Sequence, residues 1–329
     1  MALFSRRGAS DEHDPVEQEQ EQETQQEQEP AAVTLPEEIV PEVGISFSTY
    51  GRAAAVPATT RPAAQPPERT QTVPGLPDNA VVKQALAALP DKPQNTDVMN
   101  VMRQALQGHL YVRVQGDAKA LIADGQGLTL AVTVIDDKRF LLAFSGGSAL
   151  QDSVRADGDA ATSAVGQLAS TVFQNVVAGP YAGLFLDHAT PGARLILPAE
   201  LIAKALEEGD PAFTLKTLLV SERTDKTPID VAEALTRVKI WVAGNSDPSG
   251  RIGLAEARSS DGRRRLEVFS HPLEVIALGR GDRPLPLTGE QLAKALASDE
   301  GITGVVVDPA GPWIELGRTE LAPVIALAG

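Results

Sequence analysis

The 329-residue sequence contains no cysteine and only four histidines. The absence of cysteine excludes disulfide scaffolds, thiolate zinc sites, iron–sulfur clusters and cysteine nucleophiles. The histidines His13, His109, His188 and His271 fall in different predicted elements without the spacing of metal ligands, so we expect them in solvated turns. The sequence therefore predicts no metal site and no other cofactor.

Positive charge is also scarce. The chain has 29 Lys and Arg against 44 Asp and Glu, a formal net charge of −15. Because nucleic-acid surfaces need clustered cations, we expect no nucleic-acid partner. No apolar run approaches the roughly 20 residues of a membrane span, and residues 1–7 lack the apolar core of a secretory signal. We expect a cytoplasmic protein without a membrane span.

The acidic residues are concentrated near the start of the chain. Residues 1–75 carry 5 Lys and Arg against 13 Asp and Glu. Residues 17–29 contain no apolar side chain, and residues 53–77 are rich in proline, so neither stretch offers the apolar burial that offsets the entropy of ordering a chain. We predict that residues 1–78 form a disordered acidic tail.

One stretch of this tail, residues 35–52, holds most of its apolar side chains. Within it, Ile45 and Phe47 alternate with serine and Tyr50 follows, which is the two-residue period of a β-strand. One interpretation is a short motif that adds a strand to a sheet edge, on a partner or in cis. The other is a stretch with no partner. The candidate partner-binding residues are Ile45, Phe47 and Tyr50.

The rest of the chain contains an internal duplication. Short matches occur in the same order in its two halves, with a slowly drifting offset. The matched pairs are Ala105-Leu106 with Ala234-Leu235, Phe144-Ser145 with Phe269-Ser270, Gln167-Leu-Ala169 with Gln291-Leu-Ala293, Gly183–Asp187 with Gly304–Asp308, and Glu200-Leu201 with Glu320-Leu321. We predict a first domain at residues 79–210 and a second domain at residues 211–329.

Each copy has the hydrophobic pattern of the element order α-β-β-β-α-β-β-α. Residues 184–186 and 305–307 are continuously apolar, which indicates strands buried on both faces. The pattern predicts an α+β fold with a mixed sheet and about three helices per copy. We expect the second helix of the first copy to include Val165 and Leu168, and residues 213–220 to form a strand between the two sheets.

This order of elements resembles the SseB family, named for enhanced serine sensitivity in bacteria. The motifs that carry the resemblance are Leu110-Tyr-Val112, Phe144-Ser145, Gly183-Leu-Phe-Leu-Asp187 and Asp308-Pro309. The resemblance covers residues 80–329 and implies two tandem SseB-like domains, and it suggests an actinobacterial source. It transfers no catalytic residue, because the family's motifs describe a fold and carry no chemistry.

Two carboxylates and one basic cluster are the candidate site residues in the folded body. Asp187 and Asp308 end matching buried strands. Each either acts as a base or ligand contact in a cleft between the copies, or bonds the N–H groups of its own turn. The cluster Arg263, Arg264 and Arg265 either binds an anionic partner, including the tail, or forms a solvated hairpin edge. The turn at residues 145–148 is glycine-rich, but it lacks the lysine of a phosphate-binding loop, so we expect a simple strand-ending turn.

No nucleophile–base constellation is recognisable in the sequence. We therefore expect a non-enzymatic adaptor whose tail motif engages a protein partner or the folded body. Two alternatives remain open. One is a sensor that binds a small, amino acid-like molecule between the two copies, and the other is an accessory protein of a secretion system.

Overall fold

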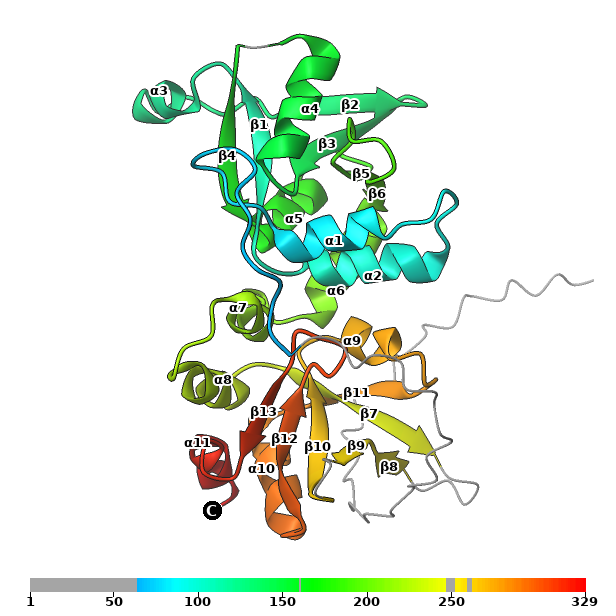
Figure 1. Cartoon of the computed structure of the whole chain (residues 1–329), viewed down its shortest axis with the longest axis vertical. Coiled ribbons are helices and arrows are strands. Elements are labelled where there is room, and N and C mark those ends of the chain that lie inside the picture. The colour runs from blue at the N-terminus through cyan, green and yellow to red at the C-terminus, as the bar shows by residue number, and fades with distance from the viewer. Residues whose placement is uncertain (1–63, 160, 247–251, 259–261) are drawn as a thin grey trace, which may run out of the picture. The chain divides into compact units, whose positions relative to one another are not determined.

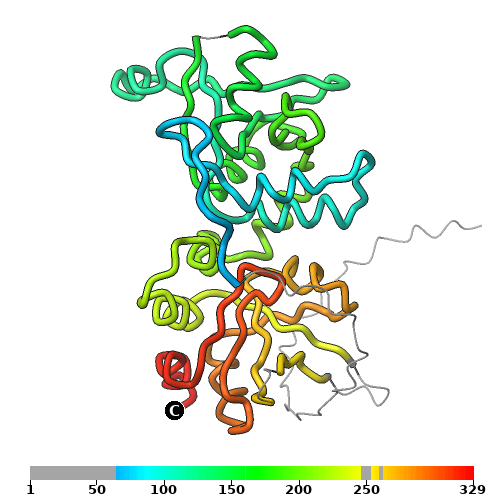
Figure 2. The backbone as a smooth tube through the Cα atoms, viewed as in Figure 1, coloured from blue at the N-terminus to red at the C-terminus, as the bar shows by residue number. Residues whose placement is uncertain are grey.

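The computed structural model describes residues 64–159, 161–246, 252–258 and 262–329 (Figures 1 and 2). The candidate motif at residues 35–52, with Ile45, Phe47 and Tyr50, lies outside the described residues. So does the rest of the predicted tail up to residue 63.

The first repeat is built around one sheet with the strand order β4-β1-β3-β5-β6, and β2 pairs with β3 beside this path. The strands are β1 (His109–Gln115), β2 (Val132–Ile135), β3 (Lys138–Phe144), β4 (Thr162–Leu168), β5 (Gly183–Leu186) and β6 (Leu195–Pro198). The helices are α1 (Ala80–Ala87), α2 (Asn95–Ala105), α3 (Ala118–Ala123), α4 (Gly147–Asp157), α5 (Ala169–Ala178) and α6 (Ala199–Glu208).

The second repeat has a sheet of matching order, β11-β7-β10-β12-β13, with β8 beside β7 and β9 beside β10. The strands are β7 (Ile240–Ser246), β8 (Ile252–Leu254), β9 (Glu256–Arg258), β10 (Arg264–Phe269), β11 (Arg283–Leu287), β12 (Ile302–Val307) and β13 (Ile314–Gly317). The helices are α7 (Thr214–Val220), α8 (Thr227–Leu235), α9 (Pro272–Ala277), α10 (Gly289–Ser298), α11 (Ala322–Ile325) and the 3₁₀ turn η1 (Ala326–Ala328).

The two sheets share one design, which confirms the predicted α+β fold with mixed sheets. The strands β3 and β5 are parallel, as are β10 and β12, whereas the other paired strands are antiparallel. The main core of each repeat combines the sheet with helices on one face: α1, α2, α5 and α6 in the first repeat, and α7, α8, α10 and α11 in the second. The duplicated sequence therefore encodes a duplicated layer structure.

A close approach of two strands explains the glycine that begins the duplicated Gly183–Asp187 motif. A Cβ atom at Gly183 would overlap the carbonyl oxygen of Leu197 on β6. A Cβ atom at Gly304 would overlap the carbonyl oxygen of Leu316 on β13 in the same way. Glycine is therefore required where each buried central strand meets its hairpin partner.

The prediction of a strand at residues 213–220 is wrong, because this stretch forms helix α7. Leu215 and Leu219, four residues apart, lie on one helical face and are buried in the core of the second repeat. Lys216 is also buried, where it pairs with Glu274. The tertiary environment on both sides of the helix outweighs the β-like composition of the segment.

The prediction that Val165 and Leu168 belong to a helix is also wrong. Residues 162–168 form strand β4, which pairs antiparallel with β1 along its whole length, and α5 begins only at Ala169. The helical spacing of the apolar residues was misleading, because Leu168 is exposed. The Gln167-Leu-Ala169 match to the second copy is consequently a coincidence of sequence, since its counterpart lies inside α10.

Residues 64–78 differ from the predicted disordered tail. We call this segment the strap. Its carbonyl oxygen at Ala64 accepts a hydrogen bond from the backbone N–H of Trp313 in the second repeat at 3.1 Å. At its other end Asp78 is buried against the first repeat and accepts hydrogen bonds from Thr70, Thr72 and Lys83. These contacts compensate for the low apolar content on which the prediction was based.

Candidate functional site

Asp187 and Asp308 occupy equivalent places at the ends of the parallel strand pairs. One oxygen of Asp187 accepts from the Ser145 N–H at 2.7 Å, and the other accepts from the Ser145 hydroxyl at 2.5 Å. Asp308 accepts from the N–H and hydroxyl of Ser270 at the same two distances. Each carboxylate therefore ties the end of one parallel strand to the end of its neighbour, rather than bonding the N–H groups of its own turn.

Both carboxyl groups are almost completely buried, with 3% of Asp187 and 2% of Asp308 exposed. Burial raises the pKa of Asp187 to about 6, despite the hydrogen bonds from Ser145. Burial and the nearby charge of Glu274 raise the pKa of Asp308 to about 7. Neither carboxyl group faces open solvent. Both connect neighbouring strands of a sheet, and neither lines a cleft.

A chain segment that precedes each repeat covers this end of its sheet. Tyr111 on β1 donates its hydroxyl hydrogen to the carbonyl of Pro77 in the strap at 3.0 Å. At the matching position on β7, the indole N–H of Trp241 donates to the carbonyl of Glu208 at 3.2 Å. The strap is therefore the counterpart, in the first repeat, of the segment that links the two repeats.

The glycine-rich turn at residues 145–148 lies beneath the strap. A Cβ atom at Gly146 would overlap the carboxylate of Asp78, and the N–H of Ser148 donates to the hydroxyl of Thr72 at 3.1 Å. The strap thus occupies the start of α4, where an anion would otherwise approach the helix N-terminus. As expected, this turn ends a strand, and the chain's own side chains cover it.

The prediction that His271 lies in a solvated turn is wrong. The residue is buried at the corresponding turn of the second repeat. Its Nδ1 accepts a hydrogen bond from the N–H of Leu273 and so caps α9. Its Nε2 therefore carries the proton that is donated to the carbonyl of Ala205 on α6, at 3.0 Å. Burial lowers the pKa of His271 to about 4, so the ring is neutral and joins the two repeats without charge.

A buried charge cluster lies beside this histidine and also joins the repeats. Arg103 on α2 and Lys216 on α7 both pair with Glu274 on α9, and Arg103 does so at 2.9 Å. Glu274 is 1% exposed and the two cations are nearly as buried. Burial alone would raise the pKa of Glu274, but the charges of Arg103 and Lys216 outweigh it and lower the pKa below its usual value.

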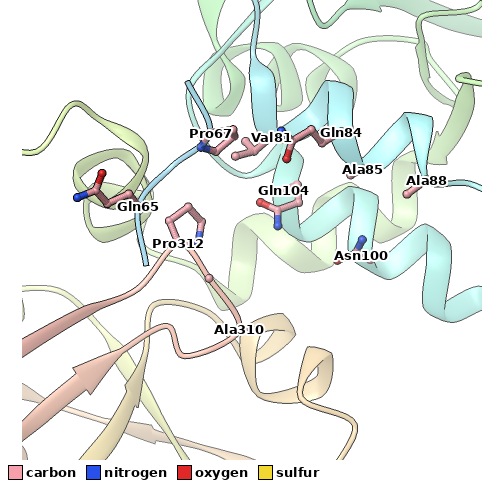
Figure 3. A pocket seen from close by; sticks show the side chains of 11 residues that line it. Gln65, Pro67, Val81, Gln84, Ala85, Ala88, Asn100, Gln104, Ala310 and Pro312 are labelled. Carbon is pink, nitrogen blue, oxygen red and sulfur yellow. The ribbon is translucent and has the colours of Figure 1, made fainter. Parts of the chain in front are cut away.

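A cavity of about 270 Å³ opens next to this cluster (Figure 3). It lies between the faces of α1 and α2, the loop that follows β12, and the strap. Four lining residues carry side-chain amides: Gln65, Gln84, Asn100 and Gln104. Small apolar residues of α1 and prolines form much of the remaining wall. The cavity is therefore a mixed polar and apolar site, built from both repeats and the strap.

The arginine cluster is engaged within the second repeat. Arg264 forms ion pairs with Glu256 at 2.7 Å and Asp299 at 2.9 Å, and hydrogen bonding to Glu256 raises its pKa further. Arg265 is buried against Glu315 and donates to the carbonyl of Leu316. Arg263 directly precedes β10. Arg264 and Arg265 are therefore engaged by groups of their own repeat, and binding of an anionic partner by the cluster stays a prediction.

Comparison with known protein families identifies the two repeats. A family model described as the SseB protein N-terminal domain matches residues 82–203 and again residues 215–322. The chain belongs to the SseB family. The double match confirms the tandem of SseB domains, whose ends lie inside the predicted limits of 79–210 and 211–329. Neither the curated proteins nor the solved structures contain a match. The actinobacterial source stays a prediction.

The described residues hold neither a metal-binding group nor a membrane-spanning helix. Among the described residues, no group of three His, Asp or Glu side chains is placed to hold a metal ion. In the same part of the chain, no helix has the length and apolar character needed to cross a membrane. The junction of the two SseB domains, with its charge cluster and cavity, is thus the candidate site.

Proposed function

We propose that this SseB-family protein is a non-enzymatic interaction protein whose tail presents residues 35–52 to a protein partner. The observation that carries the proposal is the fixed root of the tail. The carbonyl of Ala64 accepts from the Trp313 N–H, and the guanidinium of Arg223 lies 3.4 Å from the same oxygen. The tail therefore departs from a defined point on the second SseB domain.

A fixed root favours a tethering function for physical reasons. A flexible segment attached to a fixed point samples a limited volume, so a bound partner is held at a high effective concentration near the body. The 13 residues between Tyr50 and Ala64 include Pro57 and Pro62, and prolines stiffen and extend a spacer. The two aspartates that the sequence marked as site candidates are buried against serine, which further favours binding over catalysis.

The test is a capture experiment with the immobilised full-length protein and bacterial cytosol. The double variant Ile45→Asp, Phe47→Asp is expected to lose a partner that the wild type retains, because charges abolish the apolar strand face. The matched control Ser46→Ala, Ser48→Ala changes the opposite face and is expected to keep that partner. A wild type that captures nothing, or a double variant that captures the same proteins, would contradict the proposal.

The cavity at the junction favours a second candidate function, which is sensing of a small, amino acid-like molecule between the two SseB domains. A ligand that binds only the folded protein raises its stability by about 2.7 kcal/mol at a hundredfold excess over Kd. Thermal melting of the full-length protein across the amino acids is expected to reveal at least one stabilising compound. A flat melting profile across the whole panel would count against the sensor.

A further inference from the structure

The cavity at the domain junction contains an amide whose orientation is set by its neighbour. The Oδ1 atom of Asn100 accepts hydrogen bonds from Arg103 Nη2 at 2.9 Å and Nε at 3.3 Å. A guanidinium has only donors, so the amide atom that faces it must be the oxygen. The Nδ2 group of Asn100 is therefore left as a donor of hydrogen bonds.

A second amide of the cavity is held by a neighbour on the same helical face. The buried side chain of Gln107 donates its Nε2 hydrogen to Gln104 Oε1 at 2.5 Å. This contact leaves the Nε2 group of Gln104 as a donor. Figure 3 shows the Gln104 side chain projecting from α2 into the space between this helix and Pro312. Two amide donors of α2, Asn100 Nδ2 and Gln104 Nε2, therefore belong to residues that line one cavity.

The charge beneath these amides favours an anion. Arg103 and Lys216 share the carboxylate of Glu274, and Asp308, whose pKa is raised to about 7, lies within electrostatic range of Lys216 and Glu274. Arg103 also donates to the carbonyl of Gly311, which itself lines the cavity. None of the residues that line the cavity carries a negative charge. A ligand with an acidic oxygen group therefore meets amide donors, with Arg103 close behind them, and no acidic side chain in the wall.

The remaining wall sets the size and the second chemical property of the ligand. Val81, Ala85 and Ala88 of α1 present small apolar groups, and Pro67 and Pro312 contribute ring surface. A volume of about 270 Å³ holds roughly nine water molecules at about 30 Å³ each. The cavity therefore suits a compact molecule with an acidic end and a short apolar part.

We propose that this cavity binds a small carboxylate, with the carboxyl group on Asn100 Nδ2 and Gln104 Nε2 and the apolar part against Val81 and Ala85. The inference rests on the second candidate function and names its ligand class. The carboxylate has two possible sources, a free small molecule or one of the three glutamate side chains of residues 35–52. Both present the same chemistry to the two amide donors.

The experiment is a calorimetric titration of the full-length protein with sodium propionate, with propionamide as the neutral isostere and propylammonium chloride as the cation. We expect propionate to bind at least tenfold more tightly than propionamide, and propylammonium to show no binding. Asn100→Asp is expected to weaken propionate binding at least tenfold. The aspartate still accepts from Arg103 but replaces the donor with an acceptor. Gln151→Glu on exposed α4 is the matched control and is expected to change nothing.

Other outcomes separate this inference from the functions above. Equal binding of propionate and propionamide, or wild-type affinity in Asn100→Asp, would overturn the carboxylate assignment while leaving an amino-acid sensor possible. Absence of binding by every probe and every amino acid would overturn both the assignment and the sensor, but not the tail-mediated adaptor. A full-length variant with Glu37, Glu38 and Glu42 changed to glutamine identifies the source. Tighter propionate binding there assigns the natural carboxylate to the tail, and unchanged binding assigns it to a free molecule.

Discussion

Replacing Glu274 with alanine is expected to lower the free energy of unfolding by about 3–5 kcal/mol, the cost of leaving a buried charge unpaired. Within the described part of the chain, Arg103 and Lys216 both form their ion pair with Glu274. Both cations are almost fully buried, so water cannot replace the lost carboxylate. Urea unfolding of the full-length protein at neutral pH measures the change.

Two control variants separate this charge effect from a general loss of packing. Glu207→Ala removes an exposed carboxylate on α6 and is expected to change stability by less than about 0.5 kcal/mol. The triple variant Arg103→Met, Lys216→Met, Glu274→Leu removes all three charges and is expected to be much more stable than Glu274→Ala, because no unpaired ion remains. A triple variant as unstable as the single variant would show that packing, not charge, explains the loss.

The cluster also bears on how the two SseB domains unfold. Arg103 belongs to the first domain and Glu274 to the second, and their pairing is buried. Separation of the domains would leave Arg103 without its carboxylate partner, whereas Glu274 would keep Lys216 of its own domain. His271, whose ring contacts Ala205 of the first domain, adds a buried hydrogen bond across the same junction. These links favour a body in which one domain does not open without the other.

The duplication made the strand-end aspartates predictable, but not their partners. Asp187 and Asp308 were recognisable because the same motif ends the same apolar strand in both copies. Their partners Ser145 and Ser270 are also duplicated, yet they lie 42 and 38 residues away in sequence. Only the parallel pairing of β3 with β5 and of β10 with β12 brings them into contact. The sequence signal that could have predicted these pairs is a polar residue, present in both copies, at the end of each of two strands expected to be neighbours.

The charge cluster was missed for a different reason. Arg103 and Glu274 are 171 residues apart in the sequence, and Lys216, which lies between them, is 58 residues from Glu274. Glu274 and Arg103 align with no matching charge in the other copy, so the duplication offered no signal. The one hint was a cation on the otherwise apolar buried face of α2, where Val101, Met102 and Ala105 are also buried. Interactions between two repeats depend on how the repeats pack against each other, and the repeat pattern in the sequence carries no information about that packing.

The predicted local structure was wrong for segments whose conformation depends on contacts with distant residues. Strand β4 has the apolar spacing of a helix, but β1 offers seven consecutive residues for pairing. The strap is rich in proline and threonine, but the buried carboxylate of Asp78 collects the hydroxyls of Thr70 and Thr72 and the ammonium of Lys83. In both cases local composition was outweighed by hydrogen bonds to distant residues.

The variant Asp308→Asn is expected to flatten the pH dependence of stability between about pH 4 and pH 7. The folded protein holds a proton on Asp308 up to a pKa of about 7, whereas the unfolded chain releases it near 3.8. Over that interval the folded state binds more protons, so stability falls as the pH rises, by up to about 4 kcal/mol for a shift of three units. Asparagine cannot ionise, so it removes this loss while it keeps an oxygen for the Ser270 N–H.

The matched variant Asp187→Asn tests whether the position of the group, and not the substitution itself, produces the effect. The pKa of Asp187 is raised only to about 6, so its contribution to the fall in stability is complete about one pH unit earlier. Urea unfolding of both variants and the wild type from pH 4.5 to pH 8 measures the three slopes. Between pH 6 and pH 7 the slope of Asp308→Asn is expected to be shallower than that of Asp187→Asn, because Asp187 is already at least half ionised there whereas Asp308 is still at least half protonated. Identical slopes of the two variants in that interval would contradict the higher pKa of Asp308, which its burial and the nearby charge of Glu274 together cause.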